Sequence, residues 1–435
     1  MTALLILGAG TAGTTLANLL AKRPELDGAE ITVVDRSDRH DYQPGYLFVP
    51  FGMMPAGRVS KDRRRYLPKR VNFVQDDVAT IDRTNHLVRT ASGRELAWDQ
   101  LIVTTGTTPR PDVIPGMADG ALWRRRVFDF YTLDGAKALR PALAAMKRGR
   151  LVVHISEMPI KCPVAPIEFA LLAQDYLRRR GLHPSVDVVL VTPLDGAFTR
   201  PVASRRLGRL LGERGIELVT DFQIEHIDND AAELVSYDGR RAPFDLCVTI
   251  PPNRGADYLA ESGLADELGF VRVDKHTLQS TDDPDVWAAG DATNVPTSKA
   301  GSVAHFMTDA LVPNIVAHLE GRPLPERFDG HANCFIESGR GQAMLLDFNY
   351  DVEPLPGRFP IYRVPALRLL GASRANHLAK LGFEAVYWEM LIRGRPLPFA
   401  PHLSMEGKEV PDGVELPDGY APARRRRLIP RRTPS

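Results

Sequence analysis

The amino-acid sequence predicts an α/β protein with two parallel-sheet domains and a C-terminal α+β region. Three observations lead to this expectation. A strand, a glycine-rich turn, a helix and a second strand follow one another at the N-terminus, and a second strand–helix–strand unit begins near residue 149. Beyond it, residues 376–392 show the spacing of an aromatic-rich amphipathic helix.

The composition is that of an ordinary globular protein. Of the 435 residues, 44% are hydrophobic and 25% charged, and Lys plus Arg exceed Asp plus Glu by one (55 against 54), so no overall field favours nucleic acid. Three cysteines, Cys162, Cys247 and Cys334, are too few for a secreted disulfide framework, which favours a reducing compartment. The first apolar run, residues 3–7, is too short for a signal peptide, and no run of about eighteen apolar residues occurs. We therefore expect a cytoplasmic location and no bilayer-spanning segment.

The N-terminal unit carries a dinucleotide fingerprint. The strand is expected over 4–7 and the helix over 15–21, and the second strand over 31–34 ends at an acidic residue. The fingerprint residues are Gly8, Gly10, Gly13, Asp35 and its neighbour Arg36. In this Rossmann-like pattern the first glycine makes the turn, the second lets a pyrophosphate approach the backbone, and the third allows helix and strand to pack closely. The acid accepts from a ribose hydroxyl.

Later segments identify the dinucleotide by resemblance. Strand-like runs follow at 71–78 and 101–106, and the sequence 285–291 reads DVWAAGD. In this order they resemble the FAD-dependent pyridine-nucleotide-disulfide oxidoreductases, across roughly residues 1–310. The resemblance implies FAD as cofactor, with a helix N-terminus and a lysine facing the flavin. It assigns to the flavin site, besides the fingerprint, Val78, Thr105, Gly106, Gly290, Asp291, Lys299 and Gly301.

The second unit lacks the fingerprint. Residues 149–155 form a strand, 169–180 a helix and 186–191 the next strand, but the intervening turn, SEMPIKCP over 156–163, contains no glycine. Side chains and prolines obstruct a pyrophosphate there, so we expect that nicotinamide cofactors do not bind. Cys162 occupies this turn instead. Its lysine neighbour and the following helix start favour a thiolate, whereas the alternative is a small buried cysteine.

Two cysteine contexts sharpen the resemblance. KCPVAPIE at 161–168, DGHANCFIE at 329–337 and LDFNYDVEPLPG at 346–357 look like the sulfide:quinone oxidoreductase family, which is also similar to flavocytochrome c sulfide dehydrogenases. The resemblance implies that Cys162 and Cys334 form a redox-active pair. Hydrosulfide attacks their disulfide or sulfur bridge, leaving a persulfide on Cys162, and electrons pass from Cys334 through FAD to a membrane quinone. Glu168 is a candidate proton acceptor, or else a favourable charge at a helix start.

The chain departs from that family in two places. Some members carry a third cysteine, but the stretch 123–139 has none, and Cys247 lies in a strand-like apolar run where a structural role is expected. The stretch 41–44 offers no cysteine for covalent attachment, so we expect non-covalent FAD. No metal site is predicted.

The C-terminal region suggests membrane contact. Leu378, Leu381, Ala385, Trp388 and Ile392 follow helical spacing, with Lys380, Glu384 and Glu389 elsewhere, so the 376–392 helix is expected to lie peripherally in a bilayer interface, or else to pack on the protein body. The Pro-rich, arginine-rich end is expected to be disordered. Candidate quinone-stacking residues are Phe335, Phe348 and Tyr350.

The predicted organisation has four parts. These are a discontinuous FAD-binding domain (1–112 and 270–325), a second Rossmann-like domain (113–269), a quinone and membrane region (326–395) and a basic tail (396–435). Two alternatives stay open: a type II NADH:quinone oxidoreductase, which requires the missing nucleotide turn, and a flavoprotein without turnover that binds sulfur. The oligomeric state also stays open, a homo-oligomer included.

Overall fold

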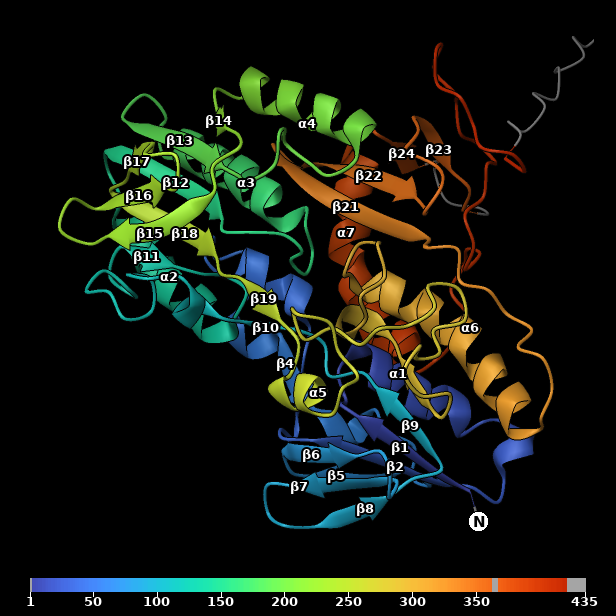
Figure 1. The fold of residues 1–435 in the computed structure, drawn as a ribbon. Coiled ribbons are helices and arrows are strands. Elements are labelled where there is room, and N and C mark those ends of the chain that lie inside the picture. Colours follow the sequence, from blue (N-terminus) through green and yellow to red (C-terminus); the bar gives the residue numbers. More distant parts are fainter. Residues whose placement is uncertain (1, 362–366, 421–435) are drawn as a thin grey trace, which may run out of the picture.

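A computed structural model describes residues 2–361 and 367–420. Two five-stranded sheets, each entirely parallel, form the cores of the first two domains, which are drawn in blue and green in Figure 1. The C-terminal region adds a smaller sheet and a long helix, in orange and red. The predicted α/β class with two Rossmann-like domains is confirmed for both sheets.

The first sheet has the strand order β20-β9-β1-β2-β5. Its members are β1 (Ala3–Leu7), β2 (Glu30–Asp35), β5 (Asn72–Gln75), β9 (Gln100–Val103) and β20 (Val286–Ala288). Helices α1 (Thr11–Leu20) and α6 (Gly301–Leu319) pack against each other beside this sheet. The strands are nearly continuous apolar runs, as expected for a parallel sheet covered on both faces. Because β20 and α6 come from late in the chain, this domain is discontinuous.

The second sheet repeats the plan, with the order β11-β18-β12-β13-β14. Its strands are β11 (Val127–Phe128), β12 (Gly149–Ile155), β13 (Val186–Val191), β14 (Glu217–Val219) and β18 (Leu246–Ile250). Its helices are α2 (Leu133–Ala145), α3 (Ala165–Arg179) and α4 (Pro201–Glu213). In each sheet the central strand, β1 or β12, is the first strand of a strand–turn–helix unit. The turn that follows this strand therefore lies at the middle of the sheet's carboxyl edge.

Each domain also carries a three-stranded antiparallel meander. One consists of β6 (Val78–Asp82), β7 (Leu87–Thr90) and β8 (Glu95–Ala97), the other of β15 (Ile224–Asp228), β16 (Glu233–Ser236) and β17 (Arg241–Pro243). The chain passes between the two domains at two places, and the short antiparallel strands β10 (Thr108–Pro109) and β19 (Asn253–Arg254) pair with each other there. The other short elements are β3 (Arg39–Asp41), β4 (Ser60–Asp62), α5 (Asp257–Glu261) and 3-10 turns at Pro24–Leu26, Gln43–Phe48, Ala56–Arg58, Arg63–Arg65, Pro111–Val113 and Gly290–Ala292.

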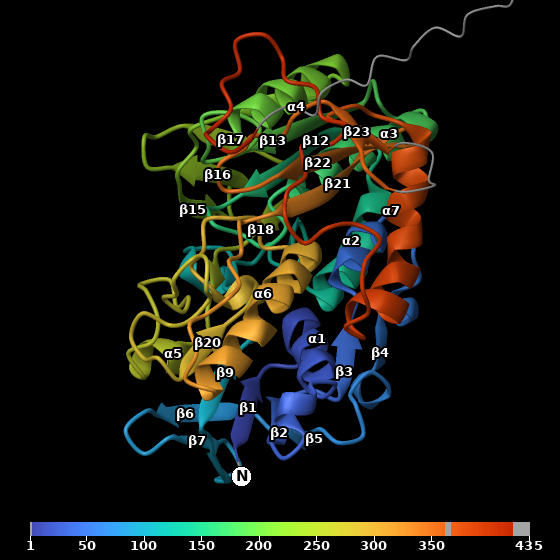
Figure 2. The same cartoon turned by 90° about the vertical axis from the view of Figure 1, so that its right-hand side faces the viewer.

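The C-terminal sheet has the order β21-β22-β24-β23. Its strands are β21 (Ala332–Gly339), β22 (Gln342–Phe348), β23 (Gly357–Phe359) and β24 (Leu367–Leu369). Helix α3 of the second domain lies against the edge strand β21, and α7 (Arg374–Val386) lies against β22. Figure 2 shows α7 running from this sheet down toward the first domain.

The apolar residues of the 376–392 stretch do not all lie on one face, contrary to what the sequence pattern predicts. Leu378 and Leu381 are 66% and 44% exposed, whereas Trp388 and Ile392 are buried. The helix turns into a π-helical turn at Tyr387–Leu391. Because a π turn adds a residue per turn, it shifts the helix face, and Trp388 rotates into the first domain, where it stacks near Tyr66. None of the helices in the described part of the chain has the length and hydropathy needed to cross a bilayer.

The expected disorder of the tail is wrong for residues 396–420. This segment, the strap, lies across the C-terminal sheet, and its Lys408 is fully buried in an ion pair with Asp347 of β22. His331 donates to or accepts from the other Asp347 oxygen at 2.8 Å, and the Asn349 amide bonds the Tyr420 hydroxyl at 2.6 Å. The buried ion pair fixes a segment whose composition alone suggested disorder. The arginine runs at 424–427 and 431–432 lie outside the described residues.

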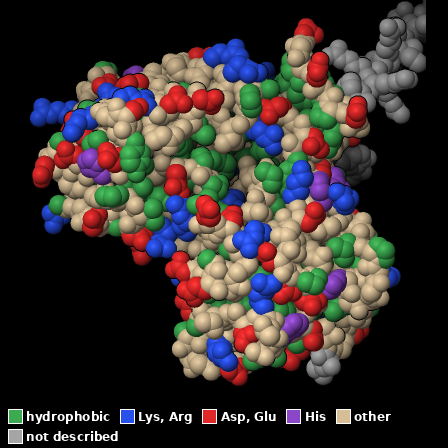
Figure 3. Space-filling view, in the orientation of Figure 1, with side chains coloured by type: hydrophobic (Ala, Val, Ile, Leu, Met, Phe, Trp, Pro, Cys, Tyr) green, Lys and Arg blue, Asp and Glu red, His purple; other side chains and the backbone are tan. Residues whose placement is uncertain are grey.

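The surface carries mixed charge. On the face shown in Figure 3, acidic and basic side chains are interspersed over both lobes, in keeping with the net charge of +1.

Candidate active site

The turn after β1 is shaped to receive a phosphate group. A Cβ on Gly8 would lie 2.7 Å from the Thr104 carbonyl oxygen, and one on Gly13 would lie 2.0 Å from the Gly8 carbonyl oxygen, so both positions exclude a side chain for reasons of folding. A Cβ on Gly10 would meet nothing within 4 Å. The space over Gly10 is therefore open, as close approach of a pyrophosphate requires.

Asp35 is tied to this turn. One carboxylate oxygen accepts from the Ala9 amide at 2.8 Å, and the other accepts from Ser37 and from the buried Arg63 guanidinium at 3.2 Å. Arg36 beside it points into solvent. The Asp35 carboxylate is thus fixed at the end of β2, the position from which a ribose hydroxyl is held in this type of fold.

Thr105 and Gly106 follow β9 at the same sheet edge. The Thr105 hydroxyl is buried and has no hydrogen-bond partner among the described residues, and Gly106 has a positive φ of 68°. Val78 is half-buried at the start of β6. An orphaned buried hydroxyl beside an open glycine cradle fits a bound dinucleotide.

Gly290, Asp291 and Gly301 stand where the first domain meets α6. Gly290 has a φ of 72°, and a Cβ there would lie 3.2 Å from the Ala12 side chain. The Asp291 carboxylate lies between Lys299 and Lys161, whose charges oppose the rise that burial causes in its pKa. Gly301 begins α6, next to Thr11.

Lys299 is placed differently from its expected role. Its ammonium donates to the carbonyl oxygens of Asp291 at 2.9 Å and Thr293 at 2.6 Å, and it lies 3.9 Å from the centre of the Phe270 ring. Burial lowers its pKa to about 8. These contacts bind the Lys299 ammonium to the protein backbone, whereas the Lys161 ammonium donates to the Gln43 amide oxygen at 2.9 Å and lies 5.9 Å from the centre of the Tyr131 ring.

The turn after β12 is filled by its own side chains. Glu157 forms an ion pair with Arg254 of β19, and the Ser156 hydroxyl donates to the Ile250 carbonyl at 2.7 Å. The Lys161 amide donates to Asn253 at 3.2 Å. Instead of an open glycine cradle, this turn presents an acidic side chain and a closed hydrogen-bond network.

The short segment before α6 touches both candidate cysteines. The Cys162 amide donates to the Lys299 carbonyl at 2.7 Å, and the Cys334 thiol lies close enough to the Ser298 side chain for that neighbour to oppose the rise in the pKa of the thiol. The Ser302 hydroxyl donates to the Asn333 carbonyl at 2.9 Å, which fixes β21 beside the same segment. The structure thus brings together two cysteines that are far apart in the sequence, one from the second domain and one from the C-terminal sheet. Both are free thiols.

Cys247 lies elsewhere. It is fully buried in β18 within a separate apolar cluster that includes Val152, Val189 and Met117.

Burial opposes the expected thiolate at Cys162. Burial raises the pKa of Cys162 well above its ordinary value and that of Cys334 to about 12, and the Glu168 charge adds to both shifts. Burial outweighs the nearby charge of the Lys161 ammonium, which donates to Gln43. Cys162 itself has a φ of 47°, in the left-handed region that non-glycine residues rarely occupy.

Glu168 lies in the first turn of α3 and is 2% exposed. Its carboxylate accepts from the Glu337 amide at 2.6 Å and pairs with the Lys380 ammonium. Burial raises the pKa of Glu168 to about 6, although Lys380 opposes the shift. A buried carboxyl with a pKa in this range suits proton transfer near neutral pH.

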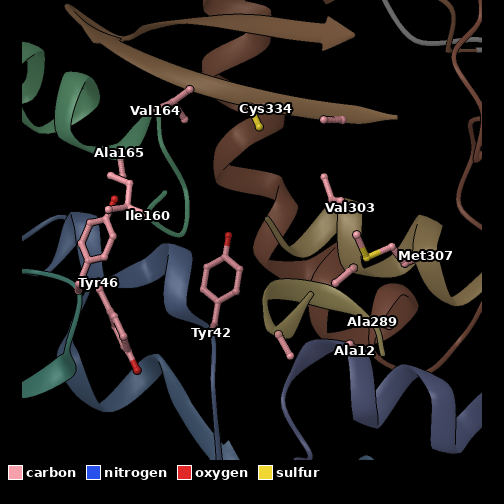
Figure 4. Close-up of a cluster of buried hydrophobic side chains, with 14 of the residues drawn as sticks. Ala12, Tyr42, Tyr46, Ile160, Val164, Ala165, Ala289, Val303, Met307 and Cys334 are labelled. Carbon is pink, nitrogen blue, oxygen red and sulfur yellow. The ribbon is translucent and has the colours of Figure 1, made fainter. Parts of the chain in front are cut away.

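Aromatic and apolar side chains form a buried cluster that includes Cys334. Figure 4 shows Tyr42 standing between two groups, with its hydroxyl directed toward the strand that carries Cys334. On one side lie Ala12, Ala289, Val303 and Met307, and on the other Tyr46, Ile160, Val164 and Ala165. Tyr131 donates to the Cys162 carbonyl at 3.0 Å.

The three candidate quinone residues are not brought together. Phe335 is half-buried on the face of β21 that packs with Leu345 and Ala379, apart from the cluster that holds Cys334. Phe348 is 2% exposed beneath the Arg200 guanidinium, and the Tyr350 hydroxyl donates to the Lys275 carbonyl at 2.9 Å.

Several site residues escape sequence reasoning. Lys380 and Glu384 fall on the polar face of the 376–392 pattern, which is ordinarily the solvent face, but here both point inward. Ser298 and His377 carry no local motif, and Glu337 ends the DGHANCFIE stretch with no signal of its partner. Only knowledge that α7 packs with its polar face inward would have identified the residues of α7.

Comparisons with known proteins agree with this geometry. Residues 2–307 match the family model described as "Pyridine nucleotide-disulphide oxidoreductase". The mitochondrial sulfide:quinone oxidoreductases of Dictyostelium discoideum and Mus musculus are similar, at 28% identity over 91% of this chain and 87% of the relative, and at 27% over 90% and 86%. The X-ray structure of the sulfide:quinone oxidoreductase from Aquifex aeolicus shares the fold, with a TM-score of 0.75, 19% identity, and coverage of 91% of this chain and 92% of that one.

The glycine cradle over Gly10 and the orphaned Thr105 hydroxyl fit the flavin that such a match implies. The chain is therefore a flavin-dependent oxidoreductase and belongs to the pyridine nucleotide-disulphide oxidoreductase family.

Proposed function

We propose that this protein oxidises sulfide at Cys162 and Cys334 and passes the electrons through non-covalently bound FAD to a membrane quinone. The observation that carries the proposal is the meeting of two cysteines from separate domains at the 298–299 segment of the flavin domain. The similarity to sulfide:quinone oxidoreductases over about nine-tenths of the chain supports the same reading.

The flavin site uses the first domain. Gly10 admits the pyrophosphate, Asp35 holds a ribose, and Gly290, Asp291 and the start of α6 face the rest of the cofactor. When bound, FAD supplies an acceptor for two electrons that a quinone can then take up. The stretch around Tyr42 provides no thiol for a covalent bond to it.

The cysteine chemistry follows from thiol–disulfide exchange. In the oxidised protein, hydrosulfide forms a bond to Cys162 Sγ, the bond between Cys162 and Cys334 breaks, and its electron pair leaves on Cys334 Sγ. Burial raises the pKa of Cys334 to about 12, so this sulfur leaves readily only where a proton donor or an electron acceptor stands beside it. Ser298, which precedes α6 of the flavin domain, lies beside that sulfur.

The side chains of α7 support attachment at a membrane surface. This helix exposes Leu378 and Leu381 while it turns Lys380 and Glu384 inward, the reverse of a helix that faces water. An outward apolar face suits the headgroup boundary of a bilayer, where a lipid quinone is met. Phe335, which packs under this helix, is the candidate among the three aromatics whose position best suits a quinone.

Anaerobic mixing tests the reaction. Sulfide should bleach the flavin rapidly, a soluble quinone should restore it, and NADH should leave it oxidised, because the turn after β12 has no room for a pyrophosphate. Bleaching by NADH would instead support the type II NADH:quinone oxidoreductase alternative. A flavin that responds to neither reductant would indicate a protein without turnover.

Vesicle sedimentation tests the membrane surface. The double substitution Leu378→Glu with Leu381→Glu should reduce binding to anionic vesicles by roughly tenfold or more. Each substitution places a charge where an exposed apolar side chain would otherwise enter the bilayer. Val113→Glu is the matched control, because Val113 is 41% exposed on another part of the surface. Equal binding of both variants would mean that α7 does not face the lipid.

A further inference from the structure

The inward face of α7 carries two cationic or titratable side chains one helical turn apart, and each meets a buried carboxylate. Lys380 pairs with Glu168 of α3, and His377 Nδ1 bonds both Glu337 oxygens, at 2.9 and 3.0 Å. The two pairs are joined, because the Glu337 amide donates to the Glu168 carboxylate at 2.6 Å.

Exposure rises along this cluster. The side chains of Glu337 and Glu168 are 1% and 2% exposed, Lys380 is 11% exposed, and His377 is 18% exposed. Glu168 stands at the inner end, where its charge acts on both thiols. His377 stands at the outer end, next in the chain to the exposed Leu378. The four groups thus connect the cysteine pair with the surface.

Packing alone gives no reason for this arrangement. Four ionisable groups buried between α3, β21 and α7 cost desolvation free energy that apolar side chains of similar size would avoid. Such clusters are retained where ionisation is used.

We propose that Glu337 and His377 form the outer half of a proton path by which the cysteine site loses a proton to solvent. The proposal rests on the sulfide chemistry proposed above. After hydrosulfide has bonded to Cys162, its sulfur still carries one proton. When that S–H bond breaks, the proton goes to Glu168 and the electron pair forms a bond from this sulfur to Cys334 Sγ. The two electrons that this sulfur–sulfur bond formation releases would be taken up by the bound flavin. The proton then crosses to the Glu337–His377 pair and leaves from the imidazole, so Glu168 returns to its ionised form.

His377 is a positioning and relay residue in this scheme, so its test separates two steps. Formation of the Cys162 persulfide precedes the proton loss and is followed by rapid quenching and mass spectrometry. Reduction of the flavin in the holoenzyme follows the proton loss and is measured by anaerobic stopped-flow absorbance. In His377→Asn, whose amide keeps a donor to Glu337, persulfide formation should match the wild type while flavin reduction slows by about tenfold.

Chemical rescue and a matched control complete the test. Added imidazole should restore flavin reduction in His377→Ala to within about twofold of the wild type, because it supplies the missing acceptor. His318→Asn removes a histidine of similar exposure that bonds Asp285 at 2.9 Å, outside the cysteine site, and should change neither step. Flavin content and thermal midpoint check the folding of each variant.

The outcomes separate the two proposals. Flavin reduction at the wild-type rate in His377→Asn, or equal slowing of both steps without imidazole rescue, overturns the proton path. Absence of a Cys162 persulfide in the wild type overturns the sulfide chemistry itself.

Discussion

The turn after β1 and the turn after β12 occupy equivalent places in two parallel sheets, at the carboxyl end of a central strand. The first is open over Gly10, and the first turn of α1 carries no acidic residue. The second is filled by the Glu157–Arg254 pair, and the first turn of α3 carries Glu168. A helix start that attracts a pyrophosphate cannot also hold a buried carboxylate at the same point, because the two negative charges repel. One architecture therefore serves two tasks, set by the residues of a single turn.

The largest effect that sharpens this contrast comes from removing the thiol of the second turn. Cys162→Ser, and Cys334→Ser equally, should retain flavin but lose reduction by sulfide by roughly a thousandfold or more, the scale of losing a covalent nucleophile. Flavin absorbance before and after anaerobic sulfide measures both properties. Retained bleaching in both variants would contradict a cysteine role for the second turn.

The first turn should respond in the opposite way. Gly10→Val places a side chain in the open cradle and should weaken flavin binding by about tenfold to about a hundredfold, the equivalent of about 1–3 kcal/mol of steric overlap, with the fold intact. Gly13→Ala should instead lower the thermal midpoint, because its Cβ would lie 2.0 Å from the Gly8 carbonyl oxygen. Flavin titration and thermal unfolding distinguish the two. Normal flavin affinity in Gly10→Val would show that the cofactor does not approach this turn.

A smaller effect concerns the charge at the start of α3. The pKa of Glu168 is raised to about 6, so the carboxylate that accepts a proton is present above this pH and disappears below it. The rate of flavin reduction by sulfide in the wild type, divided by that in Glu168→Gln, should therefore fall from about tenfold at pH 8 toward unity below pH 6. The ionisation of sulfide cancels in this ratio. A ratio that does not change with pH would remove Glu168 from the proton transfer.

Burial raises the pKa of Glu168, while Lys380 opposes the rise and the Glu337 charge adds to it. The Glu168 charge in turn raises the pKa of the neighbouring thiols and phenols, which belong to Cys334, Cys162, Tyr42 and Tyr131.

The smallest effect is expected at the third cysteine. Cys247→Ala should leave sulfide reduction unchanged and cost about 1 kcal/mol of unfolding free energy, because it removes one buried sulfur from an apolar cluster. Denaturant unfolding and stopped-flow reduction measure the two. Loss of sulfide reduction would mean that the second domain contributes more than its turn.

The features that could be predicted from the sequence are those marked by a short local pattern. The glycine turn, the two sets of parallel strands and the absence of glycine before Cys162 are each visible within about thirty residues. Pairing Cys162 with Cys334 needed the family resemblance, because nothing local relates positions so far apart.

The parts that sequence reasoning missed depend on tertiary packing. Lys161 stands next to Cys162 in the chain, yet its ammonium reaches Gln43, and burial then dominates the pKa of the thiol. The polar face of α7 predicts solvent contact, but β21 and α3 supply carboxylates that make burial of Lys380 tolerable. The π turn at Tyr387–Leu391 rotates Trp388 inward, which hydropathy spacing does not reveal.

The strap makes the cysteine site depend on a segment far beyond it in the chain. Lys408 pairs with the buried Asp347 carboxylate of β22, and β22 is paired along its length with β21, which carries Cys334. A buried carboxylate that loses its cation is strongly destabilising, by about 3–5 kcal/mol. Loss of the strap by proteolysis should therefore loosen the sheet that holds Cys334 while the flavin domain and the Cys162 turn stay folded.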